Sequence, residues 1–246
     1  MERSLPERKT DSDKEVRHLF NEKAATWNQK YESGGSLTFR VTAFCTLVAH
    51  ELSPNDKVLD LGCGTGAIAA ALADRGFQVT ACDVAEKMID AGKRIHKKFP
   101  IQWCLLHPDW KKLPFDAGSF NGLVASSVFE YLPDVNAVLL ECERVLKPGG
   151  ILIATVPNPR TLTRKFEKIV RPAAMLLDKL PGLSRIPKLH SYITYLKCSR
   201  NRMSLNEWWV RGAQAHLQVK TPLQTVASNS SLNFLVFRKP IKEAEQ

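Results

Sequence analysis

The sequence of 246 residues contains no long hydrophobic run, no cysteine pair at metal-binding spacing and no internal repeat. Its apolar stretches, such as Ile151–Val156, are far shorter than the roughly 18 residues of a membrane-spanning helix. The six cysteines are scattered without a CxxC spacing, which predicts neither a zinc site nor a disulfide framework. The first residues are charged and lack an apolar core, so we expect no secretory signal. These absences favour a reduced, cytoplasmic protein, either soluble or held at a surface.

Positive charge is what the sequence has in excess: 35 Lys and Arg against 25 Asp and Glu give a net charge of +10. Such an excess usually indicates a nucleic-acid or acidic-membrane partner. Here it is concentrated, because residues 160–211 hold 12 basic and 3 acidic residues whereas residues 1–159 hold 19 and 20. We call residues 160–211 the basic segment. Its role can be considered separately from that of the nearly neutral remainder.

The neutral part alternates short apolar runs with stretches of helical periodicity. Five runs predict buried strands: Lys57–Leu61, Gln78–Cys82, Ile101–Leu105, Asn121–Ala125 and Ile151–Val156. Three intervening stretches carry apolar residues on one helical face: Ala67–Arg75, Ala85–Phe99 and Asn136–Leu146. This alternation predicts an α/β fold, a doubly wound, mostly parallel Rossmann-like sheet with helices on both faces.

Further elements are predicted on either side of these strands. Helices over Asp13–Tyr31 and Leu37–Leu52 precede them, and a helix near Leu205–Gly212 follows. Two last strands, His216–Thr221 and Leu232–Arg238, would pair at the sheet edge and complete seven strands. We therefore divide the chain into four parts: an N-terminal helical cap (1–52), a core (53–158), a basic helical insertion between strands 5 and 6 (159–203), and a last helix with two edge strands (204–246).

A glycine-rich loop after the first predicted strand is the strongest chemical signal. Gly62, Gly64 and Gly66 fall within five positions, directly between a strand and a helix. Glycines there let the backbone approach a ligand at the carboxyl edge of a sheet, which predicts a nucleotide-like cofactor. The second strand is followed by Asp83, where a carboxylate can accept both hydroxyls of a ribose. The loop alone does not identify the cofactor, because it also fits the loose G-x-G-x-x-G/A dinucleotide pattern.

Four motifs in sequence order resemble those of the class I S-adenosylmethionine-dependent methyltransferases. They are Asp60-Leu61-Gly62-Cys63-Gly64-Thr65-Gly66, Cys82-Asp83, His107-Pro108-Asp109-Trp110 and Leu146-Lys147-Pro148-Gly149-Gly150-Ile151. The resemblance covers residues 57–158. It implies the seven-stranded methyltransferase fold, S-adenosyl-L-methionine as methyl donor and S-adenosyl-L-homocysteine as product.

The resemblance also implies which residues bind the donor. Asp60 would orient the methionyl ammonium group, the backbone of Gly62–Gly66 would pass under the methionine and ribose, and Asp83 would hold the ribose hydroxyls. The other residues implied to contact the donor are Arg40 at its carboxylate, Cys63 in the loop, Val84, Met88, Asp109 and Trp110 at the adenine, and Ser126 at the end of the fourth strand.

Within this family the chain is most similar to the O-methyltransferases of ubiquinone biosynthesis. The stretch Phe20–Trp27 resembles their N-terminal helix, and Glu130–Asp134 resembles their Glu-His-Val-Pro-Asp sequence. Their histidine is Tyr131 here, and the acid three positions before Glu130 is Ser127, so we predict no metal. Candidates for accepting a hydroxyl proton are Glu130, Tyr131 and His190, although each could equally be structural.

The loop after the fourth strand bears on the acceptor. Residues Ser126–Tyr131 lack the Asn/Asp-Pro-Pro-aromatic sequence of enzymes that methylate nucleobase amino groups, and they hold one glutamate where protein arginine methyltransferases need two. We therefore predict a small-molecule acceptor methylated at a hydroxyl oxygen, such as a phenol, a quinone precursor or another secondary metabolite. The alternative is a methyltransferase recruited to RNA or protein by the basic segment. Nucleic acid is less expected, because the segment lacks aromatic stacking motifs.

The basic segment lies where such enzymes carry insertions over the acceptor mouth. Leu162, Phe166, Ile169 and Val170 share one helical face, and most of the basic residues lie elsewhere. Three interpretations are open: a lid helix packed on the core with a solvated basic face, an amphipathic helix on an anionic membrane surface, or a site for an acidic or phosphorylated substrate. The second would place a cytoplasmic protein peripherally on the inner face of a membrane.

Overall fold

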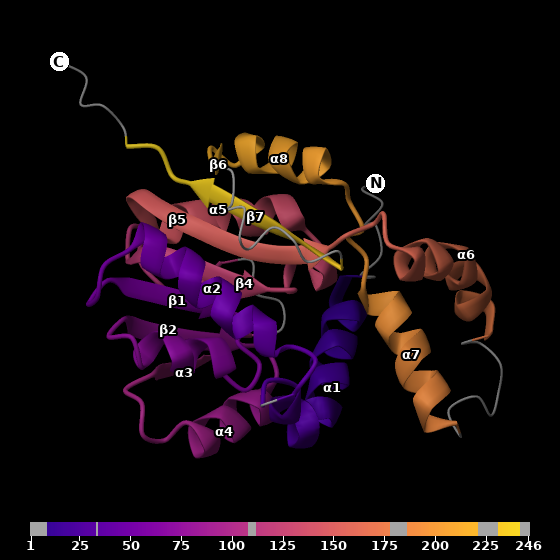
Figure 1. The fold of residues 1–246 in the computed structure, drawn as a ribbon. Coiled ribbons are helices and arrows are strands. Elements are labelled where there is room, and N and C mark those ends of the chain that lie inside the picture. Colours follow the sequence, from indigo (N-terminus) through magenta and orange to yellow (C-terminus); the bar gives the residue numbers. More distant parts are fainter. Residues whose placement is uncertain (1–8, 33, 108–111, 178–185, 221–230, 242–246) are drawn as a thin grey trace, which may run out of the picture.

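The chain forms one seven-stranded sheet with helices on both faces (Figure 1). The computed structural model describes residues 9–32, 34–107, 112–177, 186–220 and 231–241. The strands are β1 (Lys57–Leu61), β2 (Gln78–Asp83), β3 (Gln102–Leu105), β4 (Phe120–Ser126), β5 (Leu146–Pro157), β6 (Gln218–Lys220) and β7 (Leu232–Arg238). Their order is β3-β2-β1-β4-β5-β7-β6; the first five are parallel, and β7 is antiparallel to both neighbours. The predicted fold class is confirmed.

The helices cover the sheet in two layers and extend past its carboxyl edge. They are α1 (Lys9–Trp27), α2 (Thr38–Glu51), α3 (Ala67–Ala73), α4 (Glu86–Ile95), α5 (Val135–Val145), α6 (Leu162–Leu177), α7 (Pro187–Cys198) and α8 (Leu205–Gln214), with the 3-10 turns η1 (Asn28–Lys30) and η2 (Phe129–Tyr131). Helices α2 and α3 pack on one face, and α5 and α8 on the other. Beyond the sheet, α7 packs between α1 and α6 (Figure 1).

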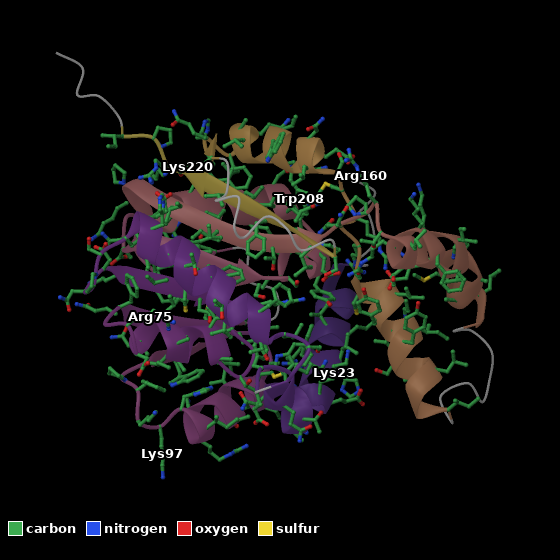
Figure 2. The ribbon with its side chains drawn as sticks, viewed as in Figure 1. Lys23, Arg75, Lys97, Arg160, Trp208 and Lys220 are labelled. Carbon is green, nitrogen blue, oxygen red and sulfur yellow. The ribbon has the colours of Figure 1, made fainter. Side chains whose placement is uncertain are left out.

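Burial on both faces explains why the parallel strands are continuous apolar runs. In β4, Leu123 and Ala125 join the core under α5 and α8, whereas Val124 joins the core under α2 and α3. Trp208 of α8 is fully buried between that helix and the sheet (Figure 2), where its ring stacks on Phe129 of η2 with centroids 5.9 Å apart. The core thereby reaches the turn that carries Glu130.

Several element boundaries differ from the predictions. The helix predicted over Ala85–Phe99 ends at Ile95, and β5 begins at Leu146, so it includes the Lys-Pro-Gly-Gly turn that we expected ahead of the strand. Helix α6 continues through Pro172, a position exposed to solvent. Helix α7 was not predicted at all. None of the helices in the described residues is long and apolar enough to cross a membrane.

The orientation of α6 differs from a lid helix that buries its whole apolar face. Leu162, Phe166 and Ile169 are exposed, whereas Glu167 is buried and Arg164 points inward with it. Three residues of the predicted apolar face are therefore exposed, and the fourth, Val170, packs with Ala174 against α7. The cause is a polar cluster beneath α6, described below, which requires charged partners on the inner face.

Candidate functional site

A cavity of about 400 Å³ opens at the carboxyl ends of β1, β2 and β4. Strand order reverses between β1 and β4, which is where parallel α/β sheets leave a crevice for ligands. The helices α1, α6 and α7 contribute walls on the side away from the sheet. The cavity is therefore bounded by the sheet edge on one side and by helices from distant parts of the chain on the other.

Asp83 braces the glycine-rich loop at the sheet edge. Its Oδ2 accepts a hydrogen bond from the backbone N–H of Gly64 at 2.8 Å, and its Oδ1 accepts one from Ala85 at 2.8 Å. Burial raises the pKa of Asp83, and these backbone donors oppose the shift. The carboxylate lines the cavity and retains lone pairs for ligand hydroxyls, since each oxygen can accept more than one hydrogen bond.

Two glycines of the loop cannot be replaced without a clash. Gly62 has φ +67°, and a Cβ there would lie 2.4 Å from Cγ2 of Val128. Gly64 has φ +55°, and a Cβ would lie 2.9 Å from Nε1 of Trp27. Positive φ and close packing together keep the loop bare, so its backbone forms the floor of the cavity.

Asp60 and Arg40 place unpaired polar atoms at this cavity. Asp60 is buried, and within the described chain its Oδ2 has no hydrogen-bond partner. Burial raises its pKa to about 7, with a further contribution from the Asp83 charge. The Nη1 of Arg40 donates to Ser126 Oγ at 3.2 Å and Ser127 Oγ at 3.0 Å, while its buried Nε is unpaired among the same residues.

These unpaired atoms fit a particular kind of ligand. A buried carboxylate oxygen suits a cationic ammonium group, and a buried guanidinium N–H suits a carboxylate. Together with the bare loop and Asp83, they match the amino-acid and ribose parts of S-adenosylmethionine. The residues present therefore fit this cofactor.

The N-terminal helix covers the loop with aromatic side chains. The Trp27 ring packs edge-on against Phe20 at 5.6 Å, and Phe20 packs against Tyr131 at 5.2 Å. The Lys30 ammonium lies 4.1 Å from the centre of the Trp27 ring, and burial lowers the pKa of Lys30, with a further contribution from the Arg40 charge. Burial also raises the pKa of Tyr31. All six side chains line the cavity.

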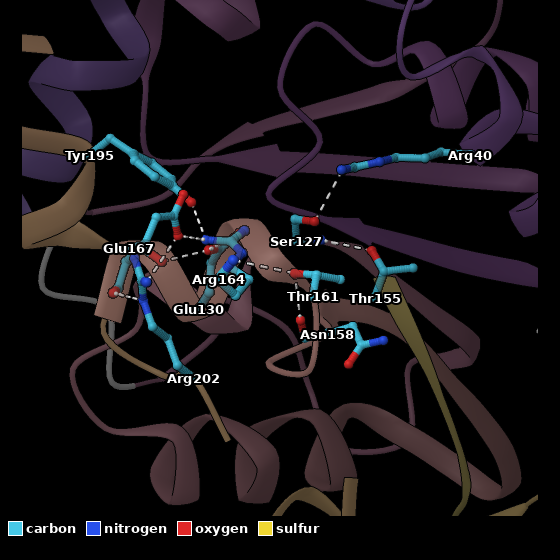
Figure 3. Close-up of polar contacts among 11 residues, drawn as sticks. Arg40, Ser127, Glu130, Thr155, Asn158, Thr161, Arg164, Glu167, Tyr195 and Arg202 are labelled. Atoms are coloured by element: carbon cyan, nitrogen blue, oxygen red, sulfur yellow. Dashed lines mark hydrogen bonds and ion pairs between the residues drawn. The ribbon is translucent and has the colours of Figure 1, made fainter. Parts of the chain in front are cut away.

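A polar cluster lies beneath α6, where Glu130, Arg164 and Tyr195 line the cavity (Figure 3). Ser199 Oγ donates to Glu130 Oε2 at 2.7 Å, and Arg164 Nη2 lies 3.7 Å from the same oxygen. Arg164 also donates to Glu167 Oε2 at 2.9 Å and to the Tyr195 hydroxyl. Burial raises the pKa of Glu130, while Arg164 and the Ser199 hydrogen bond oppose the shift.

The same cluster joins α6 to the chain after α7. Arg202 Nη1 pairs with Glu167 Oε2 at 2.9 Å, so two arginines share one buried carboxylate. The backbone N–H groups of Arg200 and Asn201 donate to the Glu130 carbonyl at 2.8 and 3.1 Å. Breaking such a buried arrangement by removing one partner is costly, because a charge is left unpaired. The cluster fixes the helices over the cavity.

Most of the predicted site residues meet in this cavity. Those lining it are Arg40, Asp60, Gly62, Cys63, Gly64, Asp83, Val84, Ser126, Glu130 and Tyr131. Asp109 and Trp110 lie outside the described residues.

Three predicted residues do not line the cavity. A Cβ on Gly66 would lie 2.4 Å from the Trp103 ring, so that glycine serves packing beside α3. Met88 is fully buried under α1 with Ala24 and Ala85. His190 is exposed on α7 and is not among the residues that line the cavity.

The cap and the basic segment contribute cavity residues that no sequence motif marks. Lys30 and Tyr195 carry no motif, and Arg164 was counted only among basic residues of α6. A usable signal existed for Phe20 and Trp27, because both lie on the apolar face of the N-terminal helix. Metal ligands were not predicted, and the described residues include no group of three His, Cys, Asp or Glu side chains arranged to hold an ion.

Comparisons with known proteins agree with the geometry. Residues 59–154 match the model of the methyltransferase domain family. A demethylmenaquinone methyltransferase of Tropheryma whipplei is 28% identical over 186 residues, covering 73% of this chain and 74% of the relative. A ubiquinone biosynthesis O-methyltransferase of Xanthomonas campestris is 30% identical over 171 residues, covering 67% and 64%. A solved structure of a SAM-dependent methyltransferase from Thermotoga maritima shares the fold with a TM-score of 0.61 at 17% identity, covering 92% of this chain and 100% of that one.

The sheet order, the bare loop, the unpaired Asp60 oxygen and these relatives point to one family. The chain belongs to the class I S-adenosylmethionine-dependent methyltransferases.

Proposed function

We propose that this enzyme methylates a small-molecule acceptor at a hydroxyl oxygen. The observation that carries the proposal is the wall of the cavity outside the glycine-rich loop. There the walls are Tyr131 of η2, Arg164 of α6, Tyr195 of α7 and Leu232 of β7, with Phe20 of α1 beside them. Walls from five elements suit a compact acceptor better than a polymer, and about 400 Å³ is within the range of small-molecule sites.

The donor side of the cavity would be held by residues already described. Asp60 would accept from the ammonium group, Arg40 would donate to the carboxylate, and Asp83 would accept from the ribose hydroxyls. S-adenosylmethionine supplies an electrophilic methyl group on a positively charged sulfur. The protein's main contribution is alignment, because holding two reacting atoms about 3 Å apart removes much of the entropic part of the barrier.

Glu130 is the residue we propose to accept the acceptor's proton. A hydroxyl oxygen that gains a methyl group must lose its hydrogen, and a carboxylate at the cavity wall can take it. Its raised pKa makes Glu130 a stronger base than an exposed glutamate, while Ser199 and Arg164 keep the ionised form accessible. Tyr131, whose pKa burial raises well above the ordinary range, stays protonated and forms part of the acceptor wall.

The relatives support a small-molecule acceptor more strongly than they support oxygen as the methylated atom. Their names refer to demethylmenaquinone and to ubiquinone biosynthesis, and only one of the two specifies oxygen. The basic segment is the observation that favours the rival, a methyltransferase recruited to RNA or protein. The rival does not explain the wall around Tyr131 and Tyr195.

A methyl-transfer screen with isotope-labelled donor tests the proposal. Its panel holds phenols, catechols, quinone precursors, total RNA and denatured protein. We expect label in a small molecule, in a methoxy group by mass spectrometry, and a loss of turnover of about 10²-fold or more in Glu130→Gln with donor affinity unchanged. The matched control is Glu86→Gln, an exposed glutamate on α4, which should leave turnover intact.

Two results would contradict the proposal. Label only in RNA or protein would favour the rival. Full turnover of Glu130→Gln on a methoxy-forming acceptor would remove Glu130 as the base.

A further inference from the structure

We propose that the outer face of α6 docks this enzyme on an anionic membrane surface. The inference does not depend on the acceptor or on the atom methylated. It rests on an apolar stripe that faces solvent, on the charges beside that stripe, and on the charged inner face that fixes its orientation.

The apolar stripe lies along the outside of α6. Leu162 is 83% exposed, Phe166 61%, Ile169 76% and Leu176 69%. Their spacing of four, three and seven residues puts them in one line on a helix. Helices at the surface of globular proteins turn such a stripe toward the core, so an outward stripe marks a contact with an apolar partner.

The basic residues identify the partner. Lys165 and Lys168 are exposed on α6 beside the stripe, and Arg160 is exposed just before the helix (Figure 2). Glu167 is the single acidic residue within α6, and it is buried on the opposite side. The outer face therefore presents apolar and positive groups with no negative one. Long basic side chains beside an apolar stripe suit a bilayer, because they reach anionic headgroups while the stripe enters the acyl boundary.

Contacts on the inner face of α6 fix the helix with its apolar stripe outward. Arg164 and Glu167 are paired beneath α6, where they join Glu130, Tyr195 and Arg202. Rotating α6 to bury the stripe would expose or separate these groups and place apolar side chains against them. The buried ion pairs therefore hold the stripe outward.

The position of α6 would bring the cavity close to the membrane surface. The helix presents its stripe outward and Arg164 to the cavity wall, so bilayer and cavity would lie on opposite sides of one helix. Docking would hold the cavity within a helix diameter of the lipid surface.

Co-sedimentation with vesicles tests the inference on the full-length chain. We compare vesicles of phosphatidylcholine alone with vesicles that also contain phosphatidylglycerol. The protein should bind the anionic vesicles, and added salt should weaken the binding. Lys165→Glu with Lys168→Glu should lower the bound-to-free ratio at least about tenfold, since each basic group contributes about fivefold. Phe166→Ser with Ile169→Ser should lower it comparably.

Matched controls separate the α6 face from general basicity. Lys93→Glu with Lys97→Glu makes the same charge change on and just after α4, far from α6 (Figure 2), and should retain most of the binding. All substituted side chains are exposed, so donor affinity and the unfolding temperature should stay unchanged. These two measurements show that each variant is folded.

Four results would overturn the inference. The first is absence of binding to anionic vesicles, and the second is an equal loss of binding in the α4 and α6 charge variants. The third is a chain that binds no vesicles but forms a dimer in sedimentation velocity, which Phe166→Ser with Ile169→Ser abolishes. The fourth is a chain that binds no vesicles but binds RNA, which Lys165→Glu with Lys168→Glu abolishes. The third would assign the stripe to a second copy of the chain, and the fourth would assign the charges to nucleic acid.

Discussion

The two sides of the cavity are built in different ways. The sheet side is formed by the backbone that directly follows β1 and β2. Asp83 accepts a hydrogen bond from the Gly64 N–H, and the glycines of the loop place no side chain in the cavity. The helical side is formed by side chains from α1, η2, α6 and α7, which are distant from one another in the sequence. The ion pair between Glu15 of α1 and Lys197 of α7, for example, joins residues 182 positions apart. One side depends on local chain geometry, and the other on buried pairing between distant residues.

This difference predicts that the two sides fail separately. Changes at the sheet side should remove donor binding, because the loop and its carboxylates act as one unit. Changes on the helical side should spare donor binding and remove acceptor turnover, because the polar cluster positions α6 and α7 over the cavity. Three experiments test this separation, in order of decreasing effect.

The largest effect is expected for Asp83→Ala. The variant loses the acceptor of two backbone hydrogen bonds and of the proposed ribose contacts. At about 1.5–3 kcal/mol for each hydrogen bond to a charged group, loss of both ribose contacts removes about 3–6 kcal/mol of binding free energy. Titration calorimetry should therefore detect no donor binding. Asp90→Ala, an exposed acid on α4, is the control, and an unchanged donor affinity in Asp83→Ala would refute the assignment.

A smaller and different effect is expected for Arg164→Ala. Removing this guanidinium leaves Glu130 without its nearest cation and Glu167 with Arg202 alone. We expect the free energy of unfolding to fall by about 3 kcal/mol in denaturant titrations and acceptor turnover to be lost, with donor affinity retained. The neighbouring exposed Lys165→Ala should change neither quantity on a water-soluble acceptor. Equal loss of donor and acceptor binding in Arg164→Ala would show that the two sides are coupled.

The smallest effect is a pH dependence caused by Asp60. Burial raises its pKa from 3.8 to about 7, so between these values the folded chain keeps a proton that the unfolded chain has released. The resulting stabilisation is complete below the lower value and is lost as the pH rises through about 7. Donor binding has the opposite dependence, because an ammonium group requires the ionised carboxylate. Calorimetry should give about tenfold weaker donor binding at about pH 6 than at about pH 8. The same slope in Asp60→Asn would assign the titration to another group.

The sheet side could be predicted from the sequence in some detail. The strand run at Lys57–Leu61 and the glycines after it are local signals, and β1 has the predicted bounds. Asp60 and Asp83 lie near the carboxyl ends of β1 and β2, which pair side by side, so their meeting at one edge follows from the parallel topology. Gly66 and Met88 were predicted from the family motifs to contact the donor, but in the structure both pack against neighbouring side chains and neither lines the cavity.

The helical side could not be predicted in this way. The periodicity of Leu162, Phe166 and Ile169 predicts an amphipathic helix, but it does not say which face turns inward. That choice depends on Glu130 and Arg202, which lie more than thirty positions away and meet α6 only in the folded chain. The exposure of His190 likewise depends on its place on α7, which no local pattern predicted.

The sequence by itself determined the fold class, the cofactor family and the loop that receives the donor, because strand runs, glycines and the carboxylates beside them act within short stretches of chain. The tertiary structure decided which side chains surround the acceptor and that the apolar stripe of α6 faces outward. Burial made that choice, because charged groups beneath α6 must be paired once water is excluded, whereas apolar side chains can remain exposed at smaller cost.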